Sequence, residues 1–138
     1  MKTFSQQPSA DDALAKIREG GRLCGKVRYT LTGDPIRIGL CHCGDCRKTS
    51  GSHFSAFAVW RIGAYSGSGE LKSYAGRSFC PECGSRVVHV RADEAEILLG
   101  SLDDPPTDIV PEYELWTIRR EAWMAGLPWA DQFDRDRP

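Results

Sequence analysis

Cys41-His42-Cys43-Gly44-Asp45-Cys46 places three thiols within six residues of the chain. In an extended segment, residues i and i+2 point to the same side, so Cys41 and Cys43 can face one metal ion. Gly44 allows the tight backbone turn that brings Cys46 to that side. Three thiolates leave one position of a tetrahedral Zn²⁺ open, which distinguishes a reactive zinc site from a closed structural one. The stretch therefore predicts an open zinc site.

The other three cysteines also have spacings typical of metal ligands. Cys80-Pro81-Glu82-Cys83-Gly84 has the form of a second metal-binding knuckle, and Cys24 is the one thiol left over. Because all six cysteines lie in or near such spacings, we expect metal ligands rather than disulfides or inert buried thiols.

Spacing alone allows two partitions of the thiols. In the first, Cys43 and Cys46 join Cys80 and Cys83 in a four-cysteine zinc ribbon, which leaves Cys24 and Cys41 unused. In the second, Cys41, Cys43 and Cys46 form the open site, and Cys24 joins the knuckle of Cys80 and Cys83. Sequence spacing does not choose between the two.

Composition describes an ordinary globular chain. Its 138 residues suffice for one domain with a real core, and 41% of them are hydrophobic and 27% charged. With 18 basic and 19 acidic residues, no overall field attracts nucleic acid or an anionic membrane. Residues 1–7 lack the apolar core of a signal peptide, and no apolar run approaches membrane-spanning length. We therefore predict a cytoplasmic protein, in whose reducing surroundings clustered cysteines are metal ligands.

The chain divides into an extension, a domain and a tail. Ser9 is a candidate helix N-cap and Gly20-Gly21 a candidate stop, so residues 1–19 are predicted to be an N-terminal extension with a short helix. Residues 20–130 form the predicted zinc-binding domain. Residues 131–138 are expected to be a solvated C-terminal tail.

Within the domain the hydrophobic period is two. Val27, Tyr29 and Leu31 alternate with polar residues, as in a half-buried strand. Glycine and proline clusters separate further strand candidates, which are 36–40, 54–60, 70–75, 85–90, 96–99 and 113–118. The pattern predicts a mostly antiparallel β fold of two facing sheets. Single helical turns are expected at 47–50 and 119–124.

Four stretches in the same order resemble the glutathione-dependent formaldehyde-activating enzyme family, whose superfamily includes centromere protein V. They are Gly20-Gly21-Arg22-Leu23-Cys24-Gly25-Lys26-Val27-Arg28-Tyr29, Cys41-His42-Cys43-Gly44-Asp45-Cys46-Arg47-Lys48, Phe79-Cys80-Pro81-Glu82-Cys83-Gly84-Ser85 and Gly100-Ser101-Leu102-Asp103-Asp104-Pro105. The resemblance covers about residues 20 to 130. It implies a β-tent fold, like that of zinc-binding methionine-R-sulfoxide reductases, with short helices at the edges.

The resemblance also implies the second partition of the thiols. A catalytic zinc would use Cys41, Cys43 and Cys46, and a structural zinc would use Cys24, Cys80 and Cys83. The chain departs from the family at one ligand, because Arg22 stands where the family usually has a further cysteine. A guanidinium stays protonated and has no lone pair to give a metal. We therefore expect one to two zinc ions per chain.

The implied activity is that of a carbon–sulfur lyase. A thiolate held by zinc near an aldehyde adds to the carbonyl carbon to give a hemithioacetal, and the reverse reaction cleaves a carbon–sulfur bond. The expected substrate is an adduct of a small thiol, glutathione, with formaldehyde or another aldehyde. His42 and His53 are candidates for moving the proton.

Cationic side chains are expected to bind the carboxylates of glutathione. Arg47 and Lys48 directly follow Cys46 and are the predicted substrate-binding residues. Further candidates, which the sequence does not orient, are Arg28, Arg61, Arg77 and Arg86.

Two other functions compete with this hypothesis. The first is a non-enzymatic zinc module that binds a protein partner, as centromere protein V suggests. The second is redox repair like that of the sulfoxide reductases. Redox repair needs a free nucleophilic cysteine, whereas metal motifs account for every thiol of this chain.

Overall fold

The computed structural model describes residues 15–138. This part of the chain is mostly β, as predicted, with one short helix, α2 (Gly44–Ser50). Its strands are β1 (Ile17–Gly21), β2 (Arg28–Thr32), β3 (Arg37–Cys41), β4 (Ser55–Arg61), β5 (Tyr65–Ser68), β6 (Lys72–Tyr74), β7 (Arg77–Phe79), β8 (Val88–Val90), β9 (Glu94–Leu98), β10 (Tyr113–Leu115) and β11 (Asp131–Gln132). Three 3₁₀ turns complete it: η1 (Ile62–Ala64), η2 (Leu99–Ser101) and η3 (Thr117–Arg119). The β-tent arrangement stays a prediction.

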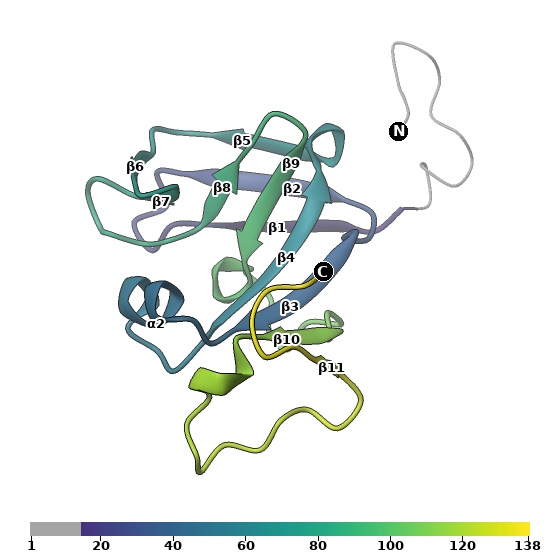
Figure 1. Cartoon of the computed structure of the whole chain (residues 1–138). Helices are drawn as coiled ribbons and strands as arrows, with labels where there is room; N and C mark the ends of the chain where they lie inside the picture. The colour runs from purple at the N-terminus through teal and green to yellow at the C-terminus, as the bar shows by residue number, and fades with distance from the viewer. Residues whose placement is uncertain (1–14) are drawn as a thin grey trace.

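The strands form two larger sheets and a small hairpin. One sheet has the order β1-β2-β5 and the other the order β11-β10-β3-β4-β9-β8, while β6 and β7 pair with each other. Pairing is antiparallel except around β10, which runs parallel to both β3 and β11. Figure 1 shows the three-stranded sheet crossing behind β4, β8 and β9. No helix of the described residues is long and apolar enough to cross a membrane.

The main core lies between these two sheets. Tyr29 and Leu31, from the alternating face of β2, pack with Trp60 of β4 and Ile97 of β9, and all four side chains are almost fully buried. Burying a large apolar side chain stabilises a fold by about 1.5–3 kcal/mol. The Trp60 indole N–H also donates to the Gly33 carbonyl oxygen at 3.0 Å, which satisfies its polar atom in the core.

A second, smaller core supports the first group of cysteines. Cys41, Phe57, Val59 and Tyr113 are buried together, and Cys43 and Cys46 pack against them among other partly buried residues. The thiols near the start of α2 therefore rest on an apolar floor formed by β3, β4 and β10.

The N-terminal helix expected to end at Gly20-Gly21 does not extend over Ile17, because 17–21 is strand β1. The expected helix start at Ser9 lies outside the described residues. Burial along β1 alternates, with Arg18 and Gly20 inward and Ile17 outward. Cross-strand pairing with β2, from Ile17↔Thr32 to Gly21↔Arg28, overrides the helical spacing of apolar residues.

The C-terminal residues 131–138 are not a free tail. Their side chains are mostly exposed, as predicted, but β11 pairs with β10. The Phe133 ring lies edge-on to Tyr113, with centroids 6.3 Å apart. The Trp116 indole N–H donates to the Asp136 carboxylate at 2.9 Å. The polar composition of the segment gave no sign of these contacts, because their partners, Tyr113 and Trp116, lie well before it in the sequence.

The helical turn expected at 47–50 exists, but the helix begins at Gly44. Cys43 acts as its N-cap, since its Sγ accepts the Cys46 backbone N–H at 3.3 Å. Gly51, with φ 68°, ends it in the left-handed conformation that glycine adopts freely. At 119–124 there is no α-helix. The 3₁₀ turn η3 comes first, and one further turn joins the Met124 N–H to the Glu121 carbonyl oxygen at 3.0 Å.

Candidate metal centres

The six cysteines form two separate groups of three. We call Cys41, Cys43 and Cys46 the first cluster, and Cys24, Cys80 and Cys83 the second cluster. Within each cluster the sulfur atoms all lie within 4.8 Å of one another, so each could hold a metal ion. Of the two partitions that spacing allowed, the structure has the second.

The end of β3 and the start of α2 build the first cluster. Cys41 is the last residue of β3, and Cys43 lies two residues later on the same side, as the extended geometry predicted. His42, between them, is completely buried, and its Nε2 lies 2.7 Å from Oε1 of Glu114 on β10. The other carboxylate oxygen of Glu114 accepts the Leu127 N–H and the Gln132 amide. This network fixes the backbone that carries two of the three thiols.

Hydrogen bonds among the thiols of the first cluster favour one thiolate. The hydrogen bond from Cys41, together with those from Cys43 and Arg77, lowers the pKa of Cys46 to about 6 against the effect of burial. The same hydrogen bond and burial raise the pKa of Cys41. A soft, partly ionised sulfur cluster in this form is suited to binding Zn²⁺.

Two of the four arginines that the sequence did not orient lie near the first cluster. Arg77 reaches it from β7, where its Nη2 is also 3.9 Å from the Asp45 carboxylate. Arg86 donates to the Thr49 hydroxyl at 3.3 Å, and burial, then the charge of Arg77, lowers its pKa. Arg86 Nε is buried with no hydrogen-bond partner among residues 15–138. Arg28, by contrast, pairs with Asp103.

The two predicted substrate-binding residues have different surroundings. Arg47 pairs with the Glu121 carboxylate at 2.7 Å and reaches the Arg119 carbonyl oxygen, so it ties α2 to the 119–121 loop. Lys48 lines a cavity of about 560 Å³ that opens at the first cluster. The other lining residues are Cys43, Gly44, Asp45, Trp116, Arg119 and Asp136. Sequence reasoning missed Trp116, Arg119 and Asp136, because the return of the chain past α2 carries no local signal.

A second cavity, of about 420 Å³, lies at the C-terminal end of α2. It is rich in hydroxyl groups from Thr49, Ser50, Ser52 and Ser55 and includes Arg86. His53, the other candidate for proton transfer, lies edge-on to Trp123 with centroids 5.1 Å apart, and its Nδ1 is 4.0 Å from Glu121. The helix therefore contributes residues to two cavities.

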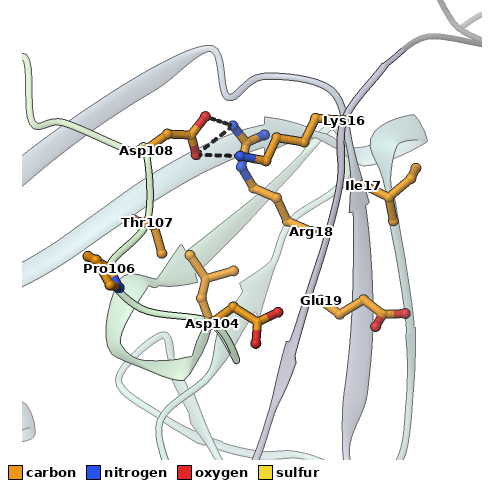
Figure 2. A pocket seen from close by; sticks show the side chains of 9 residues that line it. Lys16, Ile17, Arg18, Glu19, Asp104, Pro106, Thr107 and Asp108 are labelled. Atoms are coloured by element: carbon orange, nitrogen blue, oxygen red, sulfur yellow. Dashed lines mark hydrogen bonds and ion pairs between the residues drawn. The ribbon is translucent and has the colours of Figure 1, made fainter.

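A third cavity, of about 610 Å³, has a different character. Figure 2 shows it beside β1 and the 104–108 loop, with no cysteine in its lining. Its two cations, Lys16 and Arg18, both pair with Asp108, at 3.1 and 3.0 Å. It therefore offers no sulfur ligand, and its cations already have carboxylate partners.

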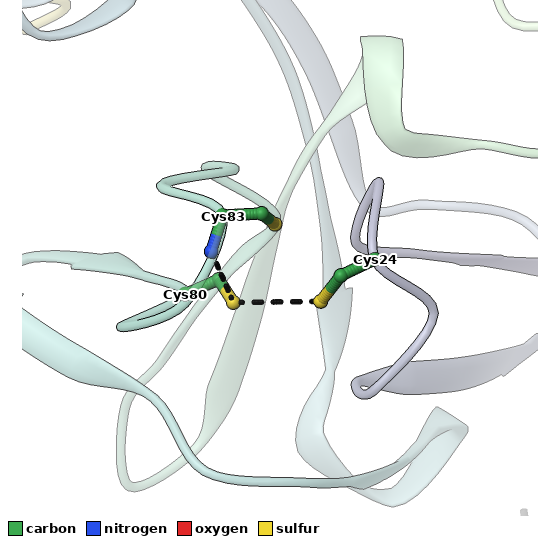
Figure 3. Close-up of side chains that lie close together, drawn as sticks. All are labelled: Cys24, Cys80 and Cys83. Carbon is green, nitrogen blue, oxygen red and sulfur yellow. Dashed lines mark hydrogen bonds between the residues drawn. The ribbon is translucent and has the colours of Figure 1, made fainter.

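The second cluster joins two distant loops, as Figure 3 shows. The sulfur atoms of Cys24 and Cys80 are 3.7 Å apart, and the backbone N–H groups of Glu82 and Cys83 both donate to Cys80 Sγ at 3.3 Å. Zinc bound to a sulfur tetrahedron at about 2.3 Å sets the sulfurs about 3.8 Å apart. The spacing and the sulfur donors therefore fit zinc. The Ser85 hydroxyl lowers the pKa of Cys83 to about 6.

Arg22 is the fourth side chain at the second cluster. Its Nη1 donates to Cys80 Sγ at 2.9 Å, and the residue is only 5% exposed. Among residues 15–138 the cluster contains no fourth cysteine, histidine or carboxylate. The structure thus has the guanidinium at the position where the sequence comparison expected a ligand.

Comparison with known proteins gives a family and a distant structural relative. Residues 17–119 match the family described as glutathione-dependent formaldehyde-activating enzyme. A crystal structure of a Rhodobacter sphaeroides protein is 19% identical, with a TM-score of 0.48 over 63% of this chain and 91% of that one. No curated protein matches. Since the matched segment spans most of the chain and contains both clusters, this protein belongs to the glutathione-dependent formaldehyde-activating enzyme family.

Proposed function

We propose that the protein is a zinc-dependent carbon–sulfur lyase that forms and cleaves the adduct of glutathione with formaldehyde or another aldehyde. The observation that carries the proposal is the first cluster, whose three sulfur atoms lie within 4.8 Å of one another and one of whose residues, Cys43, lines a cavity together with Lys48. Family membership supplies the glutathione and formaldehyde theme.

The reaction joins the glutathione sulfur to the aldehyde carbon. The sulfur lone pair forms the new S–C bond, the carbonyl π pair moves to oxygen, and that oxygen takes the proton that the thiol released. Cleavage runs the same steps backwards. Zinc bound at the first cluster would supply charge that keeps a ligand thiol ionised near neutral pH.

The cations around the first cluster would position glutathione. Lys48 and Arg119 line the cavity at Cys43, while Arg77 and Arg86 lie near Cys46. Glutathione carries two carboxylates, and fixed cations bind carboxylates through charge-assisted hydrogen bonds. Lys48 keeps its predicted role in substrate binding. Arg47, already paired with Glu121, would act by holding the 119–121 loop beside the cavity.

Of the two candidate histidines, His42 would orient the site rather than move protons. Its ring is fully buried and held by Glu114. It therefore acts as a positioning residue for Cys41 and Cys43. His53 is half exposed near Glu121 and keeps its candidacy for proton transfer.

Glutathione binding to the zinc-loaded protein tests the proposal. Titration calorimetry should detect binding of glutathione and much weaker binding of S-methylglutathione, because methylation removes the ionisable thiol. Cys43→Ser should abolish binding. Lys48→Gln should weaken it by roughly 1–3 kcal/mol if the ammonium holds a carboxylate, and the exposed Lys72→Gln is the matched control. Formaldehyde turnover should follow the same order.

Two outcomes would contradict the proposal. No heat of binding at millimolar glutathione would favour a non-enzymatic zinc module that binds a protein partner, or an enzyme for another thiol. Equal affinity for the methylated analogue would keep the cavity as a binding site and reject thiol ligation. A cytoplasmic location also stays a prediction, which fractionation of cells would test.

A further inference from the structure

The side chain of Arg22 is a buried charge without a carboxylate partner among residues 15–138. It is 5% exposed, and its Nε and Nη2 are buried with no hydrogen-bond partner in that range. Its one hydrogen bond is the 2.9 Å contact from Nη1 to Cys80 Sγ. A guanidinium taken out of water needs an anion beside it. The sulfur atoms of the second cluster are the groups in place to provide that charge.

A tight turn between β1 and β2 fixes this position. The Arg22 backbone N–H donates to the Val27 carbonyl oxygen, and the Gly25 N–H donates to the Arg22 carbonyl oxygen, both at 3.0 Å. The turn also carries Cys24 and so holds both side chains at the cluster. Arg22 is thus held where a further ligand would stand, although it cannot coordinate a metal.

The cluster retains the geometry of a metal site despite this substitution. The 3.7 Å between the Cys24 and Cys80 sulfurs is close to the edge of a zinc–sulfur tetrahedron. Cys80 Sγ accepts three N–H donors, from Arg22, Glu82 and Cys83. Three donors on one sulfur suit a charged thiolate, since a neutral thiol is a weak acceptor.

Charge counting then gives Arg22 a role. Three thiolates and one Zn²⁺ carry −1, and the guanidinium brings the group to zero, whereas four thiolates would give −2. We propose that Arg22 is the counter-charge of a three-thiolate zinc site at the second cluster. It stabilises the bound ion through Cys80 while leaving one coordination position without a protein ligand, so that zinc exchanges more readily there than from four thiolates.

Zinc affinity and zinc release test this role without any enzymatic assay. All variants carry Cys43→Ser, which disables the first cluster, so that the remaining ion belongs to the second. One zinc per chain is expected in this background, and none when Cys24→Ser is added. Arg22→Gln should weaken zinc binding about 10- to 100-fold, as loss of a group that supports a ligand does. Arg22→Lys, which keeps the charge, should retain most of the affinity.

Arg22→Cys should slow zinc transfer to a chromophoric chelator and increase the thiolate-to-metal absorption of the cobalt-substituted protein. Arg91→Gln, at an exposed arginine paired with Glu96, should change neither quantity. Circular dichroism checks that each variant is folded. If Arg22→Gln does not fold, Arg22→Lys and Arg22→Cys still give the charge and ligand comparisons.

Three results would overturn the proposal. Zinc affinity unchanged in Arg22→Gln would show that the charge is not used. A background that binds no zinc until Arg22 is neutralised would show that the guanidinium replaces the metal. Cobalt spectra identical between Arg22 and Arg22→Cys would show that a fourth ligand is already present. None of these measurements uses glutathione, so they can fail while the proposed enzyme function holds, and the reverse is also true.

Discussion

Gly20 shows how closely β1 approaches its neighbour β2 and the turn η2. A Cβ built at this position would overlap the Tyr29 hydroxyl and the Ser101 carbonyl oxygen. Those residues form one contact, because the Tyr29 and Ser101 hydroxyls are hydrogen-bonded at 2.7 Å. The absence of a side chain at residue 20 therefore lets β1 pass directly beside this buried pair.

Gly20→Ala should lower the free energy of unfolding by about 1–3 kcal/mol, the usual effect of forcing extra volume into a packed site. Urea denaturation of the zinc-loaded protein measures it. Gly63→Ala is the matched control, because nothing lies within 4 Å of a Cβ there. Equal stability of the two variants would mean that β1 can shift away from Tyr29 without loss.

Glu114 is a second residue with effects beyond its own position. It joins β10 to His42 between two cysteines and to Leu127 and Gln132 of the C-terminal segment. Glu114→Ala removes the acceptor of three buried or half-buried donors and should destabilise the protein by roughly 3–5 kcal/mol. Glu112→Ala, at an exposed carboxylate that accepts only the Ile38 N–H, should cost about 1 kcal/mol. Thermal melting that ranks the two variants in the opposite order would refute this account of the network.

At this scale the sequence predicted ligands better than their partners. Cysteine spacing singled out the six thiols that form the two clusters, because ligand geometry restricts spacing within one short segment. Arg22 and Cys80 are 58 residues apart, and His42 and Glu114 are 72 apart. No local periodicity encodes such pairs, so the arginine at the second cluster and the carboxylate behind the first became visible only in the fold.

Among the elements, β11 is short but makes contacts that support the first cluster. It is two residues long, yet it extends the six-stranded sheet and positions Phe133 on Tyr113, beside the apolar floor of the first cluster. The same segment supplies Gln132 to Glu114. The C-terminal segment thus supports the residues on which the first cluster packs.

A chain ending at Ala130 should therefore melt at a lower temperature and bind zinc at the first cluster more weakly than the full chain. Zinc content after dialysis and the melting temperature measure both effects. A chain ending at Asp136 is the control, because it retains β11, Phe133 and the Trp116 contact. If the two truncations behave alike, the segment contributes nothing to the site.

Most strands were predicted at least in part, whereas β1, β5, β7 and β11 were not. The expected strands at 36–40 and 54–60 correspond within one residue to β3 and β4, because each has a buried face. β1 was missed because Gly20-Gly21 was taken as the stop of a helix, and Arg18 gave no sign of turning inward. An arginine is usually expected at the surface, but the Arg18 side chain is buried and donates to the Gly33 carbonyl oxygen and the Asp108 carboxylate.

At the scale of the whole molecule, the second cluster joins two loops that are far apart in the sequence and that few other contacts connect. Cys24 lies in the turn between β1 and β2, and Cys80 and Cys83 follow the β6–β7 hairpin. The exposed pair of Lys26 and Glu82, at 2.6 Å, spans the same two loops, but exposed pairs contribute at most about 1 kcal/mol. Arg22 and the Leu23 backbone N–H also donate across these loops, to Cys80 Sγ and to the Ser85 hydroxyl, so metal at the cluster is expected to add to these contacts.

Removal of zinc by a chelator under reducing conditions should lower the melting temperature, and added zinc should restore it. A ligand specific to the folded state stabilises by about 2.7 kcal/mol at 100 times its dissociation constant. Differential scanning calorimetry at several free zinc concentrations gives the slope, and magnesium serves as the control ion because it prefers oxygen ligands. A melting temperature that changes with neither chelator nor added zinc would contradict this expectation.

The two clusters also differ in how far along the chain their ligands lie, and this matters before the protein has folded. The first cluster takes all its sulfurs from six consecutive residues, so a nascent or unfolded chain already carries them within reach of one ion. The second requires Cys24 and Cys80, 56 residues apart, to meet. An ion that the unfolded chain also binds contributes less to the folding equilibrium. The second cluster, despite its missing thiolate, should therefore be the one whose metal reports that folding is complete.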